Sequence, residues 1–283
     1  MLSNRLLVFS LALLFCGVCL KGMAADPVVD GDGLTSPVNW EAVYSRAHQM
    51  RSQDLDLSME MFKQVATNAE EPLAGRAILQ MALISRMLLM EPRISLEYYE
   101  AFESADNAKQ HPSYVHAHQN TLNLKRWIGR VDELEEKLLV QDEDVNTTQV
   151  LMEIGRIYRE SLSSDKYAFD AYKRTYDFSS KKYDVAYYMM GYCKHEMGAY
   201  VEATFIFQDF LERFPDSYLS ESAIDMLYRS KYLRVYYLES AEEKKKEAKD
   251  LAEEMGKFLK ENPDLDEGTQ VKLKHMLKLL KTM

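Results

Sequence analysis

Residues 184–215 read DVAYYMMGYCKHEMGAYVEATFIFQDFLERFP. Apolar residues recur there at every third or fourth position on both sides of Gly198, which is the spacing of two amphipathic helices joined by a tight turn. Gly191 and Ala203 are small enough for two antiparallel helices to cross closely. Pro215 ends the second helix, because proline has no amide hydrogen to donate within a helix. The stretch therefore predicts an antiparallel helix pair.

The same pattern recurs before and after this stretch. Leu151, Gly155 and Tyr158 repeat the spacing of the first helix. Residues 258–264, FLKENPD, repeat the ending FLERFPD of residues 210–216. Two such endings in one chain indicate an internal repeat. The residues that define the repeat are Leu151, Gly155, Tyr158, Ala168, Tyr187, Met190, Gly191, Ala203, Phe207, Phe210, Pro215, Phe258 and Pro263.

The repeat can be extended along most of the chain. Small or aliphatic residues recur at intervals of 33–40 residues, at Ala42, Ala77, Ala117, Val150, Ala186 and Ala223. This register predicts second helices near residues 57–66, 94–105 and 131–139. A last helix over residues 267–281 has an apolar stripe flanked by lysines, which suits a helix that caps a stack of repeats. A basic, partner-binding helix is the alternative. The predicted fold is all-α: an α-solenoid of about six antiparallel helix pairs plus a C-terminal capping helix, over residues 38–283.

The pattern resembles the tetratricopeptide repeat. In that repeat an aromatic residue and a Leu-Gly-like pair in the first helix are followed by Ala-x3-Phe and Pro in the second. The match is strongest over residues 148–217, although Lys194 stands where the pattern expects Tyr. The ending of residues 210–217 is similar to that of bacterial cell-envelope and periplasmic tetratricopeptide proteins of the outer-membrane assembly or envelope-coordination type. The resemblance implies first helices that line a concave, ligand-binding groove.

The N-terminus has the parts of a secretory signal peptide. Arg5 supplies a positive charge, residues 6–20 are apolar, and Ala24 ends a cleavage site of small residues. We therefore expect a signal peptide at residues 1–24, a flexible leader at residues 25–37 and an exported protein. The periplasm or cell envelope is the expected location, with secretion as a further possibility. The alternative is a segment retained as a membrane anchor.

The exported chain would be acidic and poor in cysteine. Removal of residues 1–24 leaves a formal charge of −12, which repels nucleic acid and anionic lipid. Contact with a membrane is therefore expected only through a partner or an uncleaved signal segment. Cys193 would be the one remaining thiol, so the fold is expected to hold together without a disulfide within the chain.

The sequence contains no recognisable catalytic or metal-binding motif. The pair His195-Glu196 lacks the second histidine that a zinc protease needs, because position 199 is Ala. His116 and His118 would point to different sides of a helix. No nucleophile elbow and no phosphate-binding loop is present. We therefore expect no catalytic residue, no metal site and no cofactor, and interpret the chain as a protein that is not an enzyme.

The exposed side of the first helices carries tyrosine and arginine. The predicted partner-binding groove consists of Met152, Arg156, Arg159, Tyr188, Tyr192, His195, Asp225, Arg229 and Tyr232. Tyrosine and arginine dominate many binding surfaces because they bury a large area and keep a polar end. Arginine can also pair with the carboxylates of a peptide. The other interpretation is that single tyrosines pack between repeats.

These features together predict an exported protein-binding scaffold or adaptor of the cell envelope, which holds a partner peptide or helix in its groove. Two alternatives belong to other classes. A secreted helical-toroid enzyme that acts on glycans would need paired carboxylates around a cavity, and no such set is recognisable. A lumenal co-chaperone of a eukaryotic secretory pathway would share the fold but not the compartment. The sequence does not identify the partner.

Overall fold

The computed structural model describes residues 38–105, 108–140, 146–179 and 183–283, and every regular element in these ranges is a helix. The expected signal peptide and leader, residues 1–37, lie outside the described residues. The chain forms two compact units, one ending at Ala77 and the other beginning at Ile78. None of the described helices is long and apolar enough to cross a membrane.

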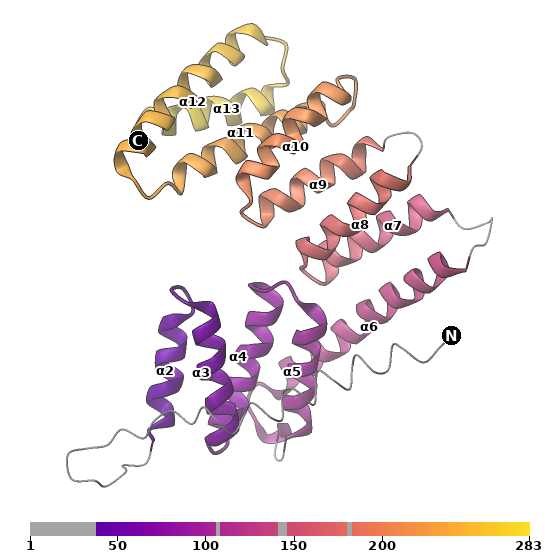
Figure 1. The fold of residues 1–283 in the computed structure, drawn as a ribbon, viewed down its shortest axis with the longest axis vertical. Coiled ribbons are helices and arrows are strands. Elements are labelled where there is room, and N and C mark those ends of the chain that lie inside the picture. Colours follow the sequence, from indigo (N-terminus) through magenta and orange to yellow (C-terminus); the bar gives the residue numbers. More distant parts are fainter. Residues whose placement is uncertain (1–37, 106–107, 141–145, 180–182) are drawn as a thin grey trace. The chain divides into compact units, whose positions relative to one another are not determined.

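The first unit contains the helix pair α2 (Trp40–Met50) and α3 (Leu55–Asn68), which pack on each other (Figure 1). Ser58 lies at their crossing, is fully buried and donates a hydrogen bond of 2.8 Å to the carbonyl of Ala47. A small hydroxyl residue lets the two backbones approach, and the hydrogen bond removes the cost of burying its polar atom. The predicted second helix at residues 57–66 lies within α3.

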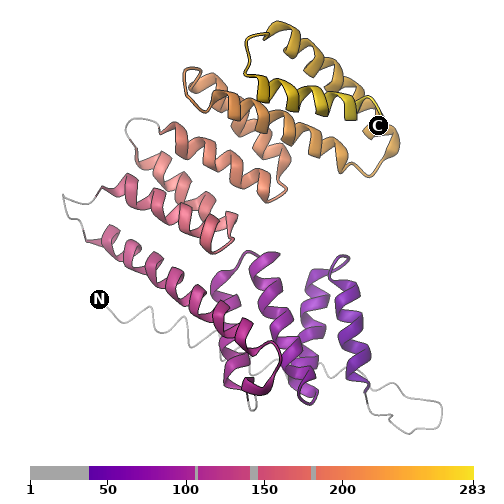
Figure 2. The same ribbon diagram turned by 180° about the vertical axis from the view of Figure 1, so that it is seen from behind.

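The second unit contains the remaining helices, which follow one another in successive pairs (Figures 1 and 2). Its elements are α4 (Leu73–Met87), which begins before the boundary, α5 (Pro92–Ser104), the 3₁₀ turn η2 (Ala108–Gln110), α6 (Tyr114–Leu139), α7 (Thr147–Arg156), the π-helical turn η3 (Ile157–Ser161), α8 (Asp165–Phe178), α9 (Asp184–Glu196), α10 (Tyr200–Arg213), α11 (Ser220–Tyr236), α12 (Ala241–Glu261) and α13 (Glu267–Leu280). From α7 to α13 each helix contacts the next, and α11 also contacts α9 and α13. Contacts between successive and alternate helices are those of an α-solenoid. The all-α solenoid prediction is confirmed.

One predicted helix pair is replaced by a single long helix. The register predicted a second helix at residues 131–139 after a break, whereas α6 runs without interruption from Tyr114 to Leu139. Leu124, Ile128 and Val131 are all buried, so one apolar stripe continues through the expected break. Gly129 is tolerated within the helix because a glycine lowers helix stability without ending the helix. The predicted break is therefore wrong.

The two glycines of the repeat pattern lie where helices cross. A Cβ atom added to Gly155 would lie 2.6 Å from the ring of Tyr172, and one added to Gly191 would lie 2.9 Å from the ring of Phe207. Each glycine therefore makes room for an aromatic ring of the following helix. Gly198 has a φ of 75° and connects α9 to α10, a backbone conformation that favours glycine.

The other residues of the repeat pattern occupy three kinds of position. Ala168, Ala203, Phe207 and Phe210 are fully buried, Leu151 and Met190 are nearly so, and Tyr158, Tyr187 and Phe258 are half-buried. Pro215 and Pro263 each lie two residues beyond the last residue of a helix, α10 and α12 respectively.

The last helix buries its apolar stripe against its neighbours. Leu273, Met276 and Leu280 of α13 are buried, and α13 contacts both α11 and α12. The lysines between them, Lys272, Lys274, Lys278 and Lys281, are exposed. This is the arrangement expected for a capping helix, although part of the surface between α12 and α13 stays open.

Candidate protein-binding surface

Seven of the nine residues predicted to line a groove reach the surface. They are Met152 and Arg156 on α7, Arg159 on η3, Tyr188 and Tyr192 on α9, and Arg229 and Tyr232 on α11, all exposed or half-buried. We call these seven residues the Tyr/Arg face. They come from the first helices of three successive pairs, as the sequence pattern predicted. Whether they contact a partner stays a prediction.

The remaining two residues do not lie on the surface. His195 is 7% exposed and Asp225 is 6% exposed, so the expected exposure is wrong for both. The hydroxyl of Ser230 lies 2.7 Å from the carbonyl of Met226 and 2.9 Å from Nδ1 of His195. Because the carbonyl can only accept, the hydroxyl donates to it, and the imidazole Nδ1–H donates to the hydroxyl oxygen. His195 therefore joins α9 to α11.

Asp225 has an equivalent structural role one helix pair further along. Its carboxylate lies 2.8 Å from the ammonium of Lys272 on α13 and 3.6 Å from the guanidinium of Arg229. It therefore joins α11 to α13 beneath the surface.

Burial lowers the pKa of His195, as does the charge of Arg229, while Glu196 and Asp225 oppose the shift. The imidazole is therefore neutral at neutral pH.

A hollow of about 370 Å³ lies at the α7 end of the Tyr/Arg face. Its lining comes from α7, η3, α8 and α9, and consists of Gln149, Met152, Glu153, Arg156, Arg159, Glu160, Tyr172, Val185 and Met189. Three of these nine residues belong to the Tyr/Arg face. The hollow therefore combines two arginines with the side chains of two methionines and a valine, which are contacts for a peptide that carries both acidic and apolar groups.

The two arginines of the hollow differ in the ion pairs that they form. Glu153 pairs with Arg130 at 2.8 Å, and Glu160 pairs with Arg159 at 2.6 Å. Arg156 is exposed and makes no ion pair with any residue in the described part of the chain. The Nε–H of Arg159 is buried and lacks a hydrogen-bond partner among the described residues. The guanidinium of Arg156 can therefore donate to a ligand, and a buried donor such as the Nε–H of Arg159 is costly while it lacks a partner.

The two tyrosines of α9 differ in what they contact. The guanidinium carbon of Arg159 lies 5.2 Å from the ring centroid of Tyr192, a cation–π contact that joins η3 to α9. Tyr188 instead packs on Phe207 and Phe210, at ring distances of 5.6 and 6.0 Å. Burial raises the pKa of Tyr188 to about 12. The interpretation as packing between helices therefore describes Tyr188, whereas Tyr192 remains the better contact residue.

Sequence reasoning missed part of the lining. Gln149 precedes Met152 and Glu153 by one helical turn, and Val185 precedes Met189 in the same way, so helical periodicity alone could have placed them on one face. The π-helical turn η3, which carries Arg159, has no signal in the residue pattern. Such turns insert one residue into a helix and shift the direction of the side chains around them.

The described residues outside this face give little basis for other chemistry. No group of three or more His, Cys, Asp or Glu residues that could hold a metal ion occurs among them. Cys193 is a free, buried thiol, and burial together with the charge of Asp165 raises its pKa. Because the thiolate is the reactive form, this cysteine is a poor nucleophile.

Comparison with known proteins finds similarity among solved structures alone. No family model matches the chain, and no curated protein matches it. Among solved structures, the chain is similar to a tetratricopeptide repeat protein from Parabacteroides merdae ATCC 43184, with 16% sequence identity over 86% of this chain and 98% of that chain, and a TM-score of 0.29. The fold of this chain is tetratricopeptide-like, because its helices follow one another in pairs and glycines lie where the paired helices cross.

Proposed function

We propose that the chain is an exported protein-binding scaffold of the cell envelope, and that its Tyr/Arg face holds a peptide or helix of a partner protein. The observation that carries this proposal is the hollow between α7 and α9, where exposed Arg156 has no ion-pair partner among the described residues. Helical repeats expose extended faces of this kind for binding other chains. The proposal includes no catalytic activity.

The chemistry of the face indicates what the partner carries. Arg156 and Arg159 can donate paired hydrogen bonds to carboxylates, and Arg159 is already oriented against the ring of Tyr192. Met152 and Met189 supply polarisable apolar surface beside them. A segment with an acidic side chain next to an apolar or aromatic one fits this combination.

The proposal is tested by a double substitution in the hollow. Arg156→Glu together with Tyr192→Ala should reduce cross-linked partner in host cells at least about tenfold, because a charge-assisted hydrogen bond contributes about 1.5–3 kcal/mol. Lys173→Glu on α8, which is also exposed, serves as the control and should leave capture unchanged. The control should melt close to the unchanged chain, because the Lys173–Asp177 ion pair that it breaks is exposed. The double variant should stay folded and melt somewhat lower, because it loses the contact between Tyr192 and Arg159. Undiminished capture by the double variant would refute the proposed surface.

Export is tested separately from binding. The N-terminal residue of the protein isolated from its host should be Ala25, which follows the expected cleavage site after Ala24. An intact chain that begins at Met1 in the cytoplasmic fraction would contradict export and leave the binding proposal standing.

A further inference from the structure

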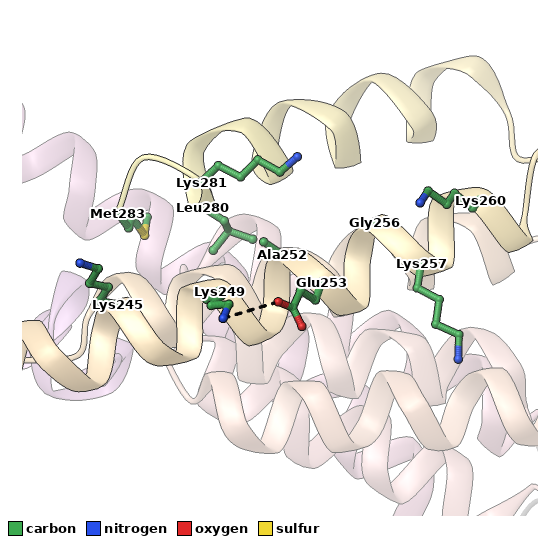
Figure 3. Close-up of a pocket in the computed structure, with 10 residues that line it drawn as sticks. All are labelled: Lys245, Lys249, Ala252, Glu253, Gly256, Lys257, Lys260, Leu280, Lys281 and Met283. Carbon is green, nitrogen blue, oxygen red and sulfur yellow. Dashed lines mark ion pairs between the residues drawn. The ribbon is translucent and has the colours of Figure 1, made fainter.

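A second hollow, larger than the first, lies between α12 and α13 and shares no residue with the Tyr/Arg face. Its volume is about 680 Å³. It is lined by Lys245, Lys249, Ala252, Glu253, Gly256, Lys257, Lys260, Leu280, Lys281 and Met283 (Figure 3). We call it the lysine groove. It was not part of the predicted groove, and the proposed function does not use it.

The floor of the lysine groove is formed by small and apolar residues. Ala252 and Leu280 are almost fully buried, so the apolar atoms are recessed rather than projecting. Gly256 lies in the C-terminal part of α12, and a Cβ atom added there would meet nothing within 4 Å. A glycine within a helix costs about 1 kcal/mol relative to alanine. Small residues one turn apart at positions 252 and 256 leave a notch into which another helix backbone can pack closely.

The walls of the groove are strongly basic. Five lysines line it, and Glu253 is the one acidic residue in the lining. Lys249 and Lys257 are 76% and 75% exposed, with ion pairs of 3.9 and 3.7 Å to Glu253 and Glu261, distances at which such pairs contribute little. Lys245, Lys260 and Lys281 form no ion pair with any described residue. The groove therefore concentrates positively charged side chains in a chain whose formal net charge is −10.

The groove has the length of a short helix. Its lining residues on α12 run from Lys245 to Lys260 and recur at the i, i+3, i+4 and i+7 spacing of one side of a helix. Fifteen residues of α-helix rise roughly 22 Å. In Figure 3, Leu280, Lys281 and Met283 of the C-terminal segment close the end of the groove near Lys245 and Lys249.

We propose that the lysine groove binds an acidic amphipathic helix of a partner protein. The apolar stripe of that helix would pack on Ala252, Gly256 and Leu280, and its flanking aspartates and glutamates would pair with the lysines of both walls. Helices that dock in this manner bury an i, i+3, i+4, i+7 stripe in an apolar groove. Charge complementarity between the two helices sets the choice of partner.

Two other occupants fit the geometry less well. A membrane surface is bound through apolar side chains that project from a helix, whereas Ala252 and Leu280 are recessed between lysines. A second copy of the chain, docked groove to groove across a two-fold axis, would bring lysines of one copy against lysines of the other, which is repulsive.

The direct test uses the mature chain and two synthetic peptides. Both have about 18 residues, the length of a short amphipathic helix, with leucines on one stripe; one carries glutamates beside the stripe and the other carries lysines. Fluorescence anisotropy should show that the glutamate peptide binds at least about tenfold more tightly than the lysine peptide, with an affinity that falls as salt screens the charges. Failure of the glutamate peptide to bind, or equal binding of both peptides, would overturn the proposal.

Two glycine substitutions test whether the glutamate peptide binds in the lysine groove. Gly256→Leu fills the notch, and Gly129→Leu places the same side chain on α6, where an added Cβ also meets nothing within 4 Å. Both variants should fold at least as stably as the unchanged chain, because leucine is a better helix former than glycine. Gly256→Leu should weaken the glutamate peptide at least about tenfold, and Gly129→Leu should leave it unchanged. Equal affinity of both variants would overturn the assignment of the groove.

Charge reversal and vesicle binding distinguish a helical partner from a membrane surface as the occupant of the groove. Lys249→Glu with Lys257→Glu should abolish binding of the glutamate peptide, and vesicles of zwitterionic lipid with anionic phosphatidylglycerol should not bind the unchanged chain. Vesicle binding that disappears with the lysine substitutions and persists in Gly256→Leu would assign the lysines to a lipid surface and overturn the proposal. Concentration-dependent dimers that disappear in Gly256→Leu would assign the groove to a second copy, with the same consequence.

Discussion

At the scale of single residues, three helical glycines of the described chain have different surroundings. Gly155 and Gly191 lie against the rings of Tyr172 and Phe207, whereas Gly129 has open space around it. Tyr172 and Phe207 are themselves buried, at 2% and 0% exposure, so neither ring can move aside easily. Glycine therefore permits close packing at positions 155 and 191, whereas at position 129 it only lowers the stability of the helix.

This difference predicts opposite effects of one substitution. Gly155→Ala should lower the free energy of unfolding by roughly 1 kcal/mol or more, because an overpacked core costs about 1–3 kcal/mol and helix propensity returns at most about 1. Gly129→Ala should raise it by about 0.5–1 kcal/mol. Urea unfolding of both variants measures the two values. A Gly155→Ala variant as stable as Gly129→Ala would show that the crossing is looser than described.

Asp165 predicts a pH dependence. Its Oδ1 atom is buried without a hydrogen-bond partner in the described residues, and burial raises its pKa, helped by the charge of Glu196. A carboxyl whose pKa is higher in the folded state binds its proton more tightly there, so the fold loses stability as pH rises above the unfolded value near 3.9. Asp165→Asn should therefore melt higher than the unchanged chain at pH 7, with a difference that shrinks toward pH 4. A lower melting temperature at pH 7 would contradict this account.

At the scale of helices, Glu91 connects parts of the second unit that are distant in sequence. It precedes α5, and its carboxylate lies 2.6 Å from the ammonium of Lys166 and 2.7 Å from the hydroxyl of Tyr167, both on α8. Nearby, the hydroxyl of Ser164 donates to the carbonyl of Met90 at 2.6 Å. These contacts fix the beginning of α5 against the beginning of α8.

The connection should weaken in acid. Burial alone would raise the pKa of Glu91, but the hydrogen bonds from Lys166 and Tyr167 outweigh it and lower the pKa below 4.5. The stability that this carboxylate contributes is therefore present above about pH 4.5 and is lost as pH falls below it. Glu91→Gln should lower the melting temperature at pH 7 and have less effect near pH 3, as measured by circular dichroism. An equal effect at both pH values would show that the charge is not involved.

Helical periodicity predicted most elements but not the continuity of α6. The buried stripe of Leu124, Ile128 and Val131 was visible in the sequence, yet a fixed repeat interval suggested that a separate second helix covers residues 131–139. The π-helical turn η3 could not be predicted either. Its hydrogen bonding depends on how the segment packs between α7 and α8, where Leu162 is fully buried, and packing of that kind leaves no periodic pattern.

At the scale of the whole molecule, the repeat interval predicted the solenoid and the order of its helices. It predicted the Tyr/Arg face only in part, because the exposure of a side chain depends on two neighbouring repeats at once. His195 and Asp225 share the helix faces of exposed residues but are buried where α9 meets α11 and α11 meets α13. The lysine groove was missed because its lining comes from two helices whose relative placement no single periodicity gives.

The central claim, that the Tyr/Arg face holds a partner protein, is tested most directly by photo-crosslinking in host cells. A photoreactive amino acid replaces Met152 or Tyr232 on the Tyr/Arg face or, as controls, Lys173 or Glu212 on α8 and α10. We predict a covalent adduct with one protein from positions 152 and 232 and none from the control positions. Adducts of equal yield from all four positions, or none at 152 and 232, would contradict the claim.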